Sequence, residues 1–363
     1  MRVLHVITSL VTAGAEHLLT DLLPCLRNIG VDVEVCVFNG TRFPFYEQME
    51  RNGFKIHVLS MKEDYYNPLL IPKLRRLMRG FDIVHTHNTA CQLFAAIAKG
   101  IGVRDEVTGR CPKLVTTEHS TSTRRRNHRI FHPIDRWMYR AYDQIICISQ
   151  PSEDSLRGYI GEGYPIKTIL NGVDVGRFLD AVPTDLGLRD RRVMTMVAGF
   201  RYEKDQPTVI KALKHLPEDY HLVLVGDGEK RLELEALAAE LGLTERVHLL
   251  GVRTDVPGIL KASDVVVMSS HREGLSLSNV EGMASGNPFV ASDVEGLREV
   301  TRGYGVLFPH GDSKALAEAV LRLTTDGEYR QEVVRRCQER ARQFDIQTMA
   351  EKYAREYGRA MRK

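Results

Sequence analysis

Short apolar runs alternate with longer amphipathic segments along almost the whole chain. Apolar runs of about four to eight residues are typical of strands that are buried on both faces of a parallel sheet. Segments with apolar residues every three or four positions predict the helices that cover such a sheet. We therefore predict an α/β protein. The expected strands lie at 3–8, 32–38, 55–59, 83–86, 114–118, 144–148 and 167–170, and then at 193–197, 221–225, 247–249, 265–268, 289–291 and 305–308.

The strand–helix pattern restarts near Val193, after a stretch that contains Asp180, Pro183 and Gly187. We expect the hinge between two domains in this stretch, within residues 174–191. A chain of 363 residues is long enough for two domains of ordinary size. Two Rossmann-like, doubly wound domains that face a central cleft are the simplest architecture.

Composition narrows the class of protein further. The formal net charge of +3 says little about partners, and the six cysteines are scattered without a Cys-x-x-Cys pair. Such cysteines are typical of reduced thiols in a cytoplasmic protein. No apolar run approaches the roughly 20 residues of a membrane span, and the first residues are too interrupted for a signal peptide. We also find no zinc-binding spacing and no nucleic-acid-binding motif.

The stretch 269–288 carries the most chemistry. It follows an apolar run, and Ser276 is placed to cap a helix whose apolar residues recur at helical spacing. A helix that starts at the carboxyl end of a parallel strand directs free backbone amides at a ligand, which suits a phosphate group. Glu273 lies just before this helix and Glu281 one turn inside it. The amides expected at the phosphate are those of Ser278, Asn279 and Val280.

Two glutamates eight positions apart also occur by chance, so the surrounding string matters. Residues 273–288 read Glu-Gly-Leu-Ser-Leu-Ser-Asn-Val-Glu-Gly-Met-Ala-Ser-Gly-Asn-Pro. This string resembles the Glu-x7-Glu signature of family 4 glycosyltransferases, a large retaining family with the GT-B fold. The resemblance implies that Glu273 contacts the donor sugar and that Glu281 holds the nucleotide ribose.

The GT-B fold also implies the arrangement of the domains. An N-terminal acceptor-binding domain would span residues 1–175, and a nucleotide-sugar-binding domain would span residues 176–344. The final helical segment, 345–363, would cross back to the first domain.

Several glycine turns and strand ends in the chain are similar to further motifs of this family. Gly14 follows the first strand and matches a glycine that lies against the donor phosphates, although Ala13 replaces the glycine before it. His119 follows the fifth strand and matches a histidine that contacts the donor sugar. Residues 171–174, Asn-Gly-Val-Asp, match the entry to the second domain. Each of these could also be an ordinary turn or a local hydrogen bond.

The nucleotide side of the resemblance lies in the second half of the chain. Lys204 matches a lysine that grips the diphosphate, but the family's arginine position falls on Gly199, so Arg201 is at best a displaced substitute. Gly226 belongs to a Val-Gly-x-Gly turn that borders the nucleotide, and such a short motif is weak evidence alone. Two residues whose backbone groups are expected to contact a uracil edge are Val252 and Arg253.

Two other groups of residues could be either functional or ordinary loop and surface residues. His85 and His87 follow the fourth strand, where an ordinary loop histidine is the commoner case, and we keep His87 as an acceptor-side candidate. The arginines between residues 124 and 140 are interleaved with aromatic and apolar residues. This segment is either a solvated face or a docking site for anionic lipid at the inner face of the membrane. The arginines named for that site are Arg124, Arg125, Arg126 and Arg129.

The predicted function is transfer of a sugar, with retention, from a nucleotide-sugar donor to a saccharide or lipid-linked saccharide acceptor. A UDP-sugar is the expected donor, and surface polysaccharide or glycoconjugate synthesis is the expected setting. Glu273, His119 and Lys204 are the expected catalytic residues, without a metal or other cofactor, because no Asp-x-Asp motif is present. Two alternatives are a non-hydrolysing sugar-nucleotide epimerase of the same fold and a nucleotide-binding subunit without activity.

Overall fold

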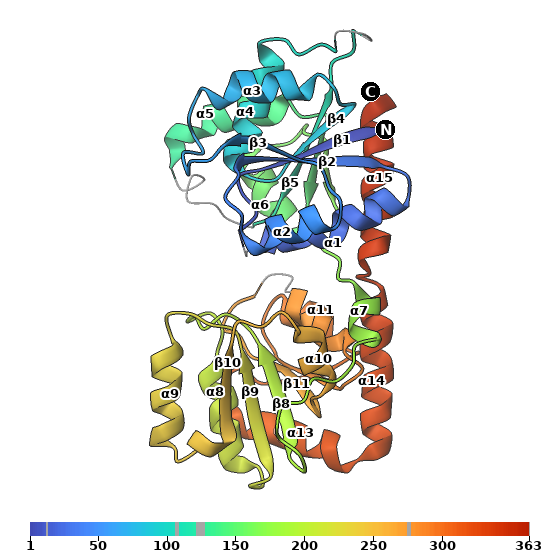
Figure 1. Ribbon diagram of the computed structural model, residues 1–363. Helices are drawn as coiled ribbons and strands as arrows, with labels where there is room; N and C mark the ends of the chain where they lie inside the picture. Colours follow the sequence, from blue (N-terminus) through green and yellow to red (C-terminus); the bar gives the residue numbers. More distant parts are fainter. Residues whose placement is uncertain (12–13, 106–108, 121–127, 274–276, 363) are drawn as a thin grey trace. The chain divides into compact units, whose positions relative to one another are not determined.

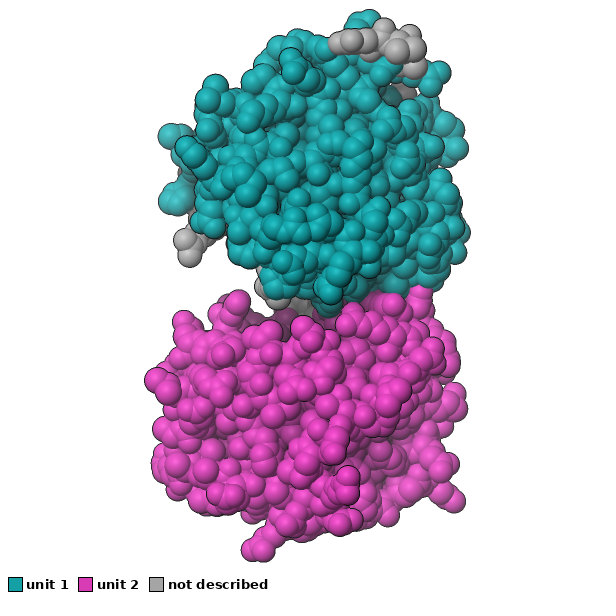
Figure 2. All heavy atoms as spheres, in the orientation of Figure 1, with its two compact units in different colours: residues 1–172, 346–363 teal, residues 173–345 magenta. Residues whose placement is uncertain are grey.

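The chain folds into two compact units in a computed structural model. Unit 1 holds residues 1–172 and 346–363, and unit 2 holds residues 173–345 (Figure 2). The structure describes residues 1–11, 14–105, 109–120, 128–273 and 277–362, and at residue 129 it describes the backbone alone. Residues 174–191, where we expect the hinge, belong to unit 2, because the side chains of Val175 and Phe178 are buried in its core.

Unit 1 is built on one parallel sheet of seven strands in the order β3-β2-β1-β4-β5-β6-β7 (Figure 1). Its strands are β1 (Arg2–Ile7), β2 (Asp32–Asn39), β3 (Ile56–Ser60), β4 (Ile83–Thr86), β5 (Lys113–Glu118), β6 (Gln144–Cys147) and β7 (Ile166–Thr168). Its helices are α1 (Gly14–Asn28), α2 (Pro44–Arg51), α3 (Leu70–Met78), α4 (Thr89–Gly100), α5 (His132–Arg140), α6 (Gln150–Ile160) and α15 (Ile346–Arg362), with a 3-10 turn η2 (Arg129–Phe131) before α5.

Apolar side chains on the two faces of this sheet form two separate cores. One core lies under α1, α2 and α15, and the other lies under α3, α4, α5 and α6. Helix α15 packs on the sheet because its buried side chains recur at helical spacing along one face. These include Met349, Tyr353, Tyr357 and Ala360.

Unit 2 has a parallel sheet of six strands in the order β10-β9-β8-β11-β12-β13. Its strands are β8 (Arg192–Val197), β9 (Tyr220–Val225), β10 (Val247–Gly251), β11 (Val265–Met268), β12 (Phe289–Ser292) and β13 (Val306–Phe308). Its helices are α7 (Val175–Leu179), α8 (Gln206–Ala212), α9 (Arg231–Glu240), α10 (Val256–Lys261), α11 (Leu277–Ala284), α12 (Leu297–Thr301), α13 (Ser313–Thr325) and α14 (Gly327–Arg342), with 3-10 turns η3 (Leu213–His215) and η4 (Thr244–Arg246).

The predicted fold class is confirmed by these two sheets. Each expected strand is present, with ends that differ by a few residues, and all the pairings between named strands are parallel. In the part of the chain that the structure describes, none of the helices combines the length and the apolar character that crossing a bilayer requires.

Candidate functional site

Lys204 and Glu273 form an ion pair in unit 2. Strands β8 and β11 are neighbours, so the loops that follow them lie at the same edge of the sheet. The Lys204 ammonium donates to the Glu273 carboxylate, and the Ser270 hydroxyl donates to the same oxygen at 3.3 Å. The Lys204 side chain is 21% exposed and that of Glu273 is 15% exposed. Two of the predicted catalytic residues are therefore in contact and still reachable from solvent.

Backbone hydrogen bonds fix the two loops that carry this ion pair. The His271 amide donates to the Glu203 carbonyl at 2.9 Å, and the Asp205 amide donates to the Ser269 carbonyl at 3.1 Å. The Asp205 carboxylate also caps α8 by accepting from the Thr208 amide, and it accepts from the Ser269 hydroxyl at 2.9 Å. The position of Lys204 relative to Glu273 is thus set by the backbone.

Helix α11 starts at Leu277, so its first turns hold the predicted phosphate-binding amides and Glu281. Residues 274–276 lie outside the described residues, which leaves the expected cap at Ser276 untested. Ser278, Asn279 and Val280 are in the first turn, where backbone amides have no carbonyl partner within the helix. Asn279 is fully buried, and its Nδ2 has no hydrogen-bond partner among the described residues. Glu281 is also buried.

The glycines of the Val-Gly-x-Gly turn have a packing role. A Cβ atom at Gly226 would lie 2.1 Å from the Ala198 carbonyl oxygen, and one at Gly228 would lie 2.4 Å from the Phe200 carbonyl oxygen. Backbone bonds join the same loops, because the Phe200 amide donates to Asp227 and the Gly226 amide donates to Gly251. Only residues without a side chain allow this approach of the loops after β8, β9 and β10.

Arg201 occupies space beside the position where the family has an arginine. A Cβ atom at Gly199 would lie 3.7 Å from Arg201 Nε, which is ordinary contact. Arg201 and Lys204 line the same pocket of about 560 Å³ in unit 2. The basic or imidazole side chains that line this pocket outnumber its two glutamates, Glu233 and Glu240, although Lys230 donates to Glu233. They are Arg201, Lys204, Lys211, Lys230 and His271. Such a lining favours an anionic ligand.

The side chain of Arg253 is already engaged within the protein. Its guanidinium donates two hydrogen bonds to Asp255, at 2.8 and 2.7 Å, and Asp255 also accepts from the Thr184 hydroxyl at 3.1 Å. The hydrogen bond from Arg253 lowers the pKa of Asp255 to about 2. Val252 is 69% exposed. A ligand at this loop would therefore meet backbone groups and the Val252 side chain.

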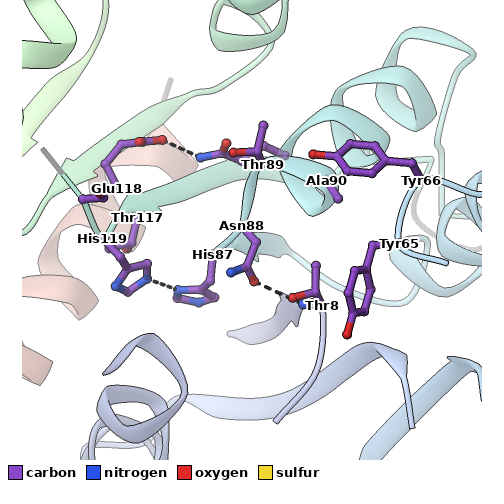
Figure 3. A pocket seen from close by; sticks show the side chains of 12 residues that line it. Thr8, Tyr65, Tyr66, His87, Asn88, Thr89, Ala90, Thr117, Glu118 and His119 are labelled. Carbon is purple, nitrogen blue, oxygen red and sulfur yellow. Dashed lines mark hydrogen bonds between the residues drawn. The ribbon is translucent and has the colours of Figure 1, made fainter. Parts of the chain in front are cut away.

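A second pocket lies in unit 1, at the carboxyl ends of β1, β4 and β5 (Figure 3). It has a volume of about 320 Å³, and His87, Asn88 and His119 are among its lining residues. His87 Nδ1 and His119 Nε2 are 3.0 Å apart, and Asn88 Oδ1 accepts from the Thr8 amide at 3.1 Å. The predicted donor-sugar histidine and the acceptor-side candidate thus share one pocket.

Gly14 differs from Gly226 and Gly228 of unit 2. It begins α1, and a Cβ atom there would meet nothing within 4 Å among the described residues. The described residues therefore leave room for a side chain at this position, and the expected contact of Gly14 with the donor phosphates stays a prediction.

Two family models match the chain. The model described as glycosyltransferase family 4 matches residues 12–177, and the model described as glycosyl transferases group 1 matches residues 183–344. The chain belongs to family 4 of the glycosyltransferases. This membership decides against the epimerase alternative.

Individual proteins are similar to this glycosyltransferase over most of their length. It is 27% identical over 351 residues to the UDP-Gal:α-D-GlcNAc-diphosphoundecaprenol α-1,3-galactosyltransferase of Escherichia coli, with 90% of this chain and 88% of that protein covered. The crystal structure of Anabaena HepE in complex with UDP-glucose has a TM-score of 0.80 at 25% identity and covers 99% of both chains. WaaG, a glycosyltransferase involved in lipopolysaccharide biosynthesis, has a TM-score of 0.66 at 16% identity, covering 97% of this chain and 98% of that one. With the two parallel sheets, these similarities show the GT-B fold.

The glycosyltransferase contains a group of interior histidines, of which His5 was not singled out from the sequence. His85 lies inside β4 and is fully buried, so our placement of it in a loop is wrong. Burial lowers the pKa of His85 and His87 well below the usual value, and it lowers the pKa of His5 to about 3 and that of His119 to about 4. The sequence does contain an indication that His5 is buried. Side chains alternate between the faces of a strand, so His5 lies on the same face of β1 as Val3 and Ile7.

Among the described residues, two groups of side chains have the residue types that bind metal ions. The ligand atoms of Asp205, His271 and His310 lie within 4.8 Å of one another, a set that suits a transition metal ion. In the other group, both ring nitrogens of His5, His85 and His87 already have hydrogen-bond partners in the protein. That second group is therefore a hydrogen-bonded cluster.

The arginine-rich segment between residues 124 and 140 is described only in part. Arg124, Arg125 and Arg126 lie outside the described residues, as does the side chain of Arg129. Helix α5 presents Arg136 and Arg140 to solvent. Large apolar side chains are exposed beside them, namely Ile130, Ile134 and Trp137.

Proposed function

We propose that this glycosyltransferase transfers a sugar from a UDP-sugar to a saccharide or lipid-linked saccharide acceptor, with retention of the anomeric configuration. The observation that carries the proposal is the contact between Lys204 and Glu273. By our proposal, the Lys204 ammonium binds the diphosphate and the adjacent Glu273 carboxylate binds the sugar. The similarity to HepE, whose structure contains UDP-glucose, and to a UDP-galactose-dependent transferase supports a UDP-sugar.

Departure of the diphosphate is the difficult step. Negative charge grows on the leaving oxygen while the sugar gains oxocarbenium character. By our proposal, the Lys204 ammonium, the Arg201 guanidinium and the first-turn amides of α11 stabilise that charge. Each charge-assisted hydrogen bond contributes about 1.5–3 kcal/mol. These groups supply the stabilisation without a metal ion, so we propose that none is required.

Glu273 and Glu281 have different proposed roles. When the diphosphate draws the Lys204 ammonium, the Glu273 carboxylate becomes available to orient a sugar hydroxyl. Glu281 would hold the ribose, Gly14 would lie against the phosphates, and His119 would contact the sugar. A leaving phosphate oxygen would take the acceptor proton as the acceptor attacks from the same face, which accounts for retention.

The proposed role of Glu273 can be tested by measuring turnover. Glu273→Gln removes the negative charge and keeps the shape, so we expect kcat to fall by about 10²–10⁴. Glu299→Gln, at an exposed position on α12 in the same unit, is the matched control and should keep full turnover. Unchanged kcat in Glu273→Gln would show that the carboxylate has no role in transfer.

The base and the sugar of the donor need a binding measurement. Calorimetric titration with UDP, GDP and ADP should give the highest affinity for UDP, and a panel of UDP-sugars should then identify the sugar by thermal stabilisation. A preference for GDP or ADP would overturn the UDP assignment. Release of UDP only when a saccharide acceptor is present would distinguish transfer from simple nucleotide binding, and so decide against an inactive subunit.

We further propose that the surface around α5 binds anionic lipid, which would bring a lipid-linked acceptor to the enzyme. Exposed arginines beside Ile134 and Trp137 suit a surface that meets head groups and the upper acyl region. Trp137 is the sole tryptophan and is 47% exposed, so its emission should shift to the blue on vesicles of phosphatidylglycerol.

Charge reversal tests this surface directly. Arg136→Glu with Arg140→Glu, or Arg124 to Arg126 replaced by glutamate, should abolish sedimentation with phosphatidylglycerol vesicles. The same reversal at Arg189 and Arg335, which are exposed in unit 2, should leave sedimentation unchanged. Equal sedimentation of all variants would exclude α5 as the docking surface.

A further inference from the structure

A continuous file of hydrogen-bonded side chains runs through the interior of unit 1. It begins at His119 in the pocket of Figure 3 and ends at Tyr353 on α15. Its links are His119–His87 at 3.0 Å, His87–His5 at 3.0 Å, His5–Tyr357 at 3.4 Å, Tyr357–His85 at 2.6 Å, His85–Thr117 at 2.8 Å and Thr117–Tyr353 at 3.1 Å.

The register of the sheet brings these groups together. His5 and His85 are paired across β1 and β4, and Thr117 lies on the next strand, β5. All three face α15, where Tyr353 and Tyr357 are one helical turn apart. Apart from His119 at the pocket, the members of the file are buried. Water is therefore not available to replace a missing partner.

Neutral imidazoles make the file directional. A neutral imidazole donates from one nitrogen and accepts at the other, and a hydroxyl has a single proton to donate. Burial keeps these four imidazoles neutral. When the Tyr357 hydroxyl donates to one of its two imidazole neighbours and accepts from the other, reversing that hydroxyl reverses the imidazole links on both sides, so the file has two ordered states. In one state each histidine carries its proton on Nε2, and in the other each carries it on Nδ1.

The contacts of Tyr357 indicate which state is present. Its oxygen lies 2.6 Å from His85 Nδ1 but 3.4 Å from His5 Nε2. Hydrogen bonds donated by a hydroxyl are typically shorter than those donated by an N–H group. These distances favour Tyr357 as the donor to His85 and the acceptor from His5. This direction puts the proton of His119 on Nε2 and leaves Nδ1 as an acceptor.

We propose that the file holds His119 as its Nε2–H tautomer, so that Nδ1 accepts a hydrogen bond from a hydroxyl of the donor sugar. Tyr357 is then a positioning residue, although it lies on the last helix of the chain. The consequence for transfer rests on the proposed contact of His119 with the donor. The tautomer itself does not depend on that proposal and can be measured without any substrate.

Nitrogen-15 NMR of histidine-labelled enzyme gives the tautomer of each imidazole. We expect His5, His85, His87 and His119 all as Nε2–H in the wild type, with His119 assigned through the loss of its signal in His119→Gln. Tyr357→Phe removes the hydroxyl that joins His5 to His85. In that variant we expect His119 to populate both tautomers, and kcat/KM for the donor to fall roughly 2- to 10-fold, as for one weakened hydrogen bond.

Matched variants separate the file from a general packing effect. Tyr220→Phe removes a buried hydroxyl that bonds Thr324 in unit 2 and should leave the tautomer and kcat/KM unchanged. If Tyr357→Phe does not fold, Thr117→Val interrupts the file at another link. An Nδ1–H tautomer of His119 in the wild type, or an unaltered His119 signal in a folded variant, would overturn the proposal. A changed His119 signal with unaltered kcat/KM would uphold the file and show that the proposed sugar contact of His119 is wrong.

Discussion

Four histidines in the interior of unit 1, of which three are buried and His119 is partly exposed at the pocket, predict a loss of stability in mild acid. His5, His85, His87 and His119 have pKa values in the folded state that burial places far below 6.5, the ordinary value. Between pH 7.5 and 5.5 the unfolded chain binds protons at these positions and the folded chain does not. Because the unfolded state binds more protons, the free energy of unfolding falls as the pH falls.

The size of this loss in unfolding free energy follows from the pKa of histidine in the unfolded chain. At pH 5.5, one unit below the ordinary pKa, each histidine that stays neutral in the folded state costs about 1.4 kcal/mol. Four such groups cost about 5–6 kcal/mol, which is comparable with the whole stability of many domains. Glu34 and Asp143, two carboxylates of unit 1, have lowered pKa values and therefore titrate below this window. Burial raises the pKa of Glu16, so the folded state binds a proton at this carboxyl more readily than the unfolded state does. This offsets part of the loss of unfolding free energy as the pH falls.

Urea unfolding followed by tryptophan fluorescence measures this loss in unit 1, where the sole tryptophan, Trp137, lies. We expect a clearly lower unfolding free energy at pH 5.5 than at pH 7.5. His119→Asn should reduce the difference by about a quarter. His128→Asn, at an exposed position, should leave it unchanged. Equal unfolding free energies at the two pH values would refute the neutral, buried state of the cluster.

Three further predictions concern ligands and glycines. Glu281→Gln should weaken UDP binding by about 1.5–3 kcal/mol in calorimetry, the range for a hydrogen bond to a charged group, and unaltered affinity would count against the ribose contact. Gly226→Ala should destabilise unit 2 by roughly 2–4 kcal/mol, because its Cβ would meet the Ala198 carbonyl oxygen at 2.1 Å. Gly14→Ala should change the free energy of unfolding by less than about 0.5 kcal/mol, because its Cβ would meet nothing within 4 Å among the described residues. Transfer should persist in excess EDTA; activity that is lost there and restored by a divalent metal would instead implicate a site such as Asp205, His271 and His310.

The strands were predictable because parallel strands buried on both faces are apolar along their whole length. The expected hinge, residues 174–191, lies directly after the division between the two units at residues 172 and 173. Residues 174–191 contain the polar and glycine-rich stretch that usually marks a linker, yet Val175 and Phe178 anchor its beginning in the core of unit 2. Two buried side chains decide the boundary there, and a composition argument cannot detect them.

The site was predictable where its residues follow strands directly. Lys204 and Glu273 come after β8 and β11, and the strand order of a doubly wound sheet brings such loops together. The Gly-x-Gly turn was found for a partly different reason, since Gly226 and Gly228 are required by backbone packing whether or not a nucleotide is bound. The glycines of this motif therefore have a structural requirement of their own, independent of the nucleotide contact that we propose for the turn.

The histidine file could not be predicted from the local pattern of apolar and polar residues. His5 and Tyr357 are separated by 352 residues, and they meet only because the last helix packs on the face of the sheet that carries His5 and His85. Along the sequence, each of these residues is a single polar group in an apolar run, which ordinarily weakens the prediction of a buried element. Together they satisfy one another's hydrogen bonds, so three imidazoles and two phenols can be buried behind His119, each with a hydrogen-bond partner along the file. If the NMR experiment finds the uniform tautomer, the crossing helix contributes to the chemistry of the pocket as well as to the stability of unit 1.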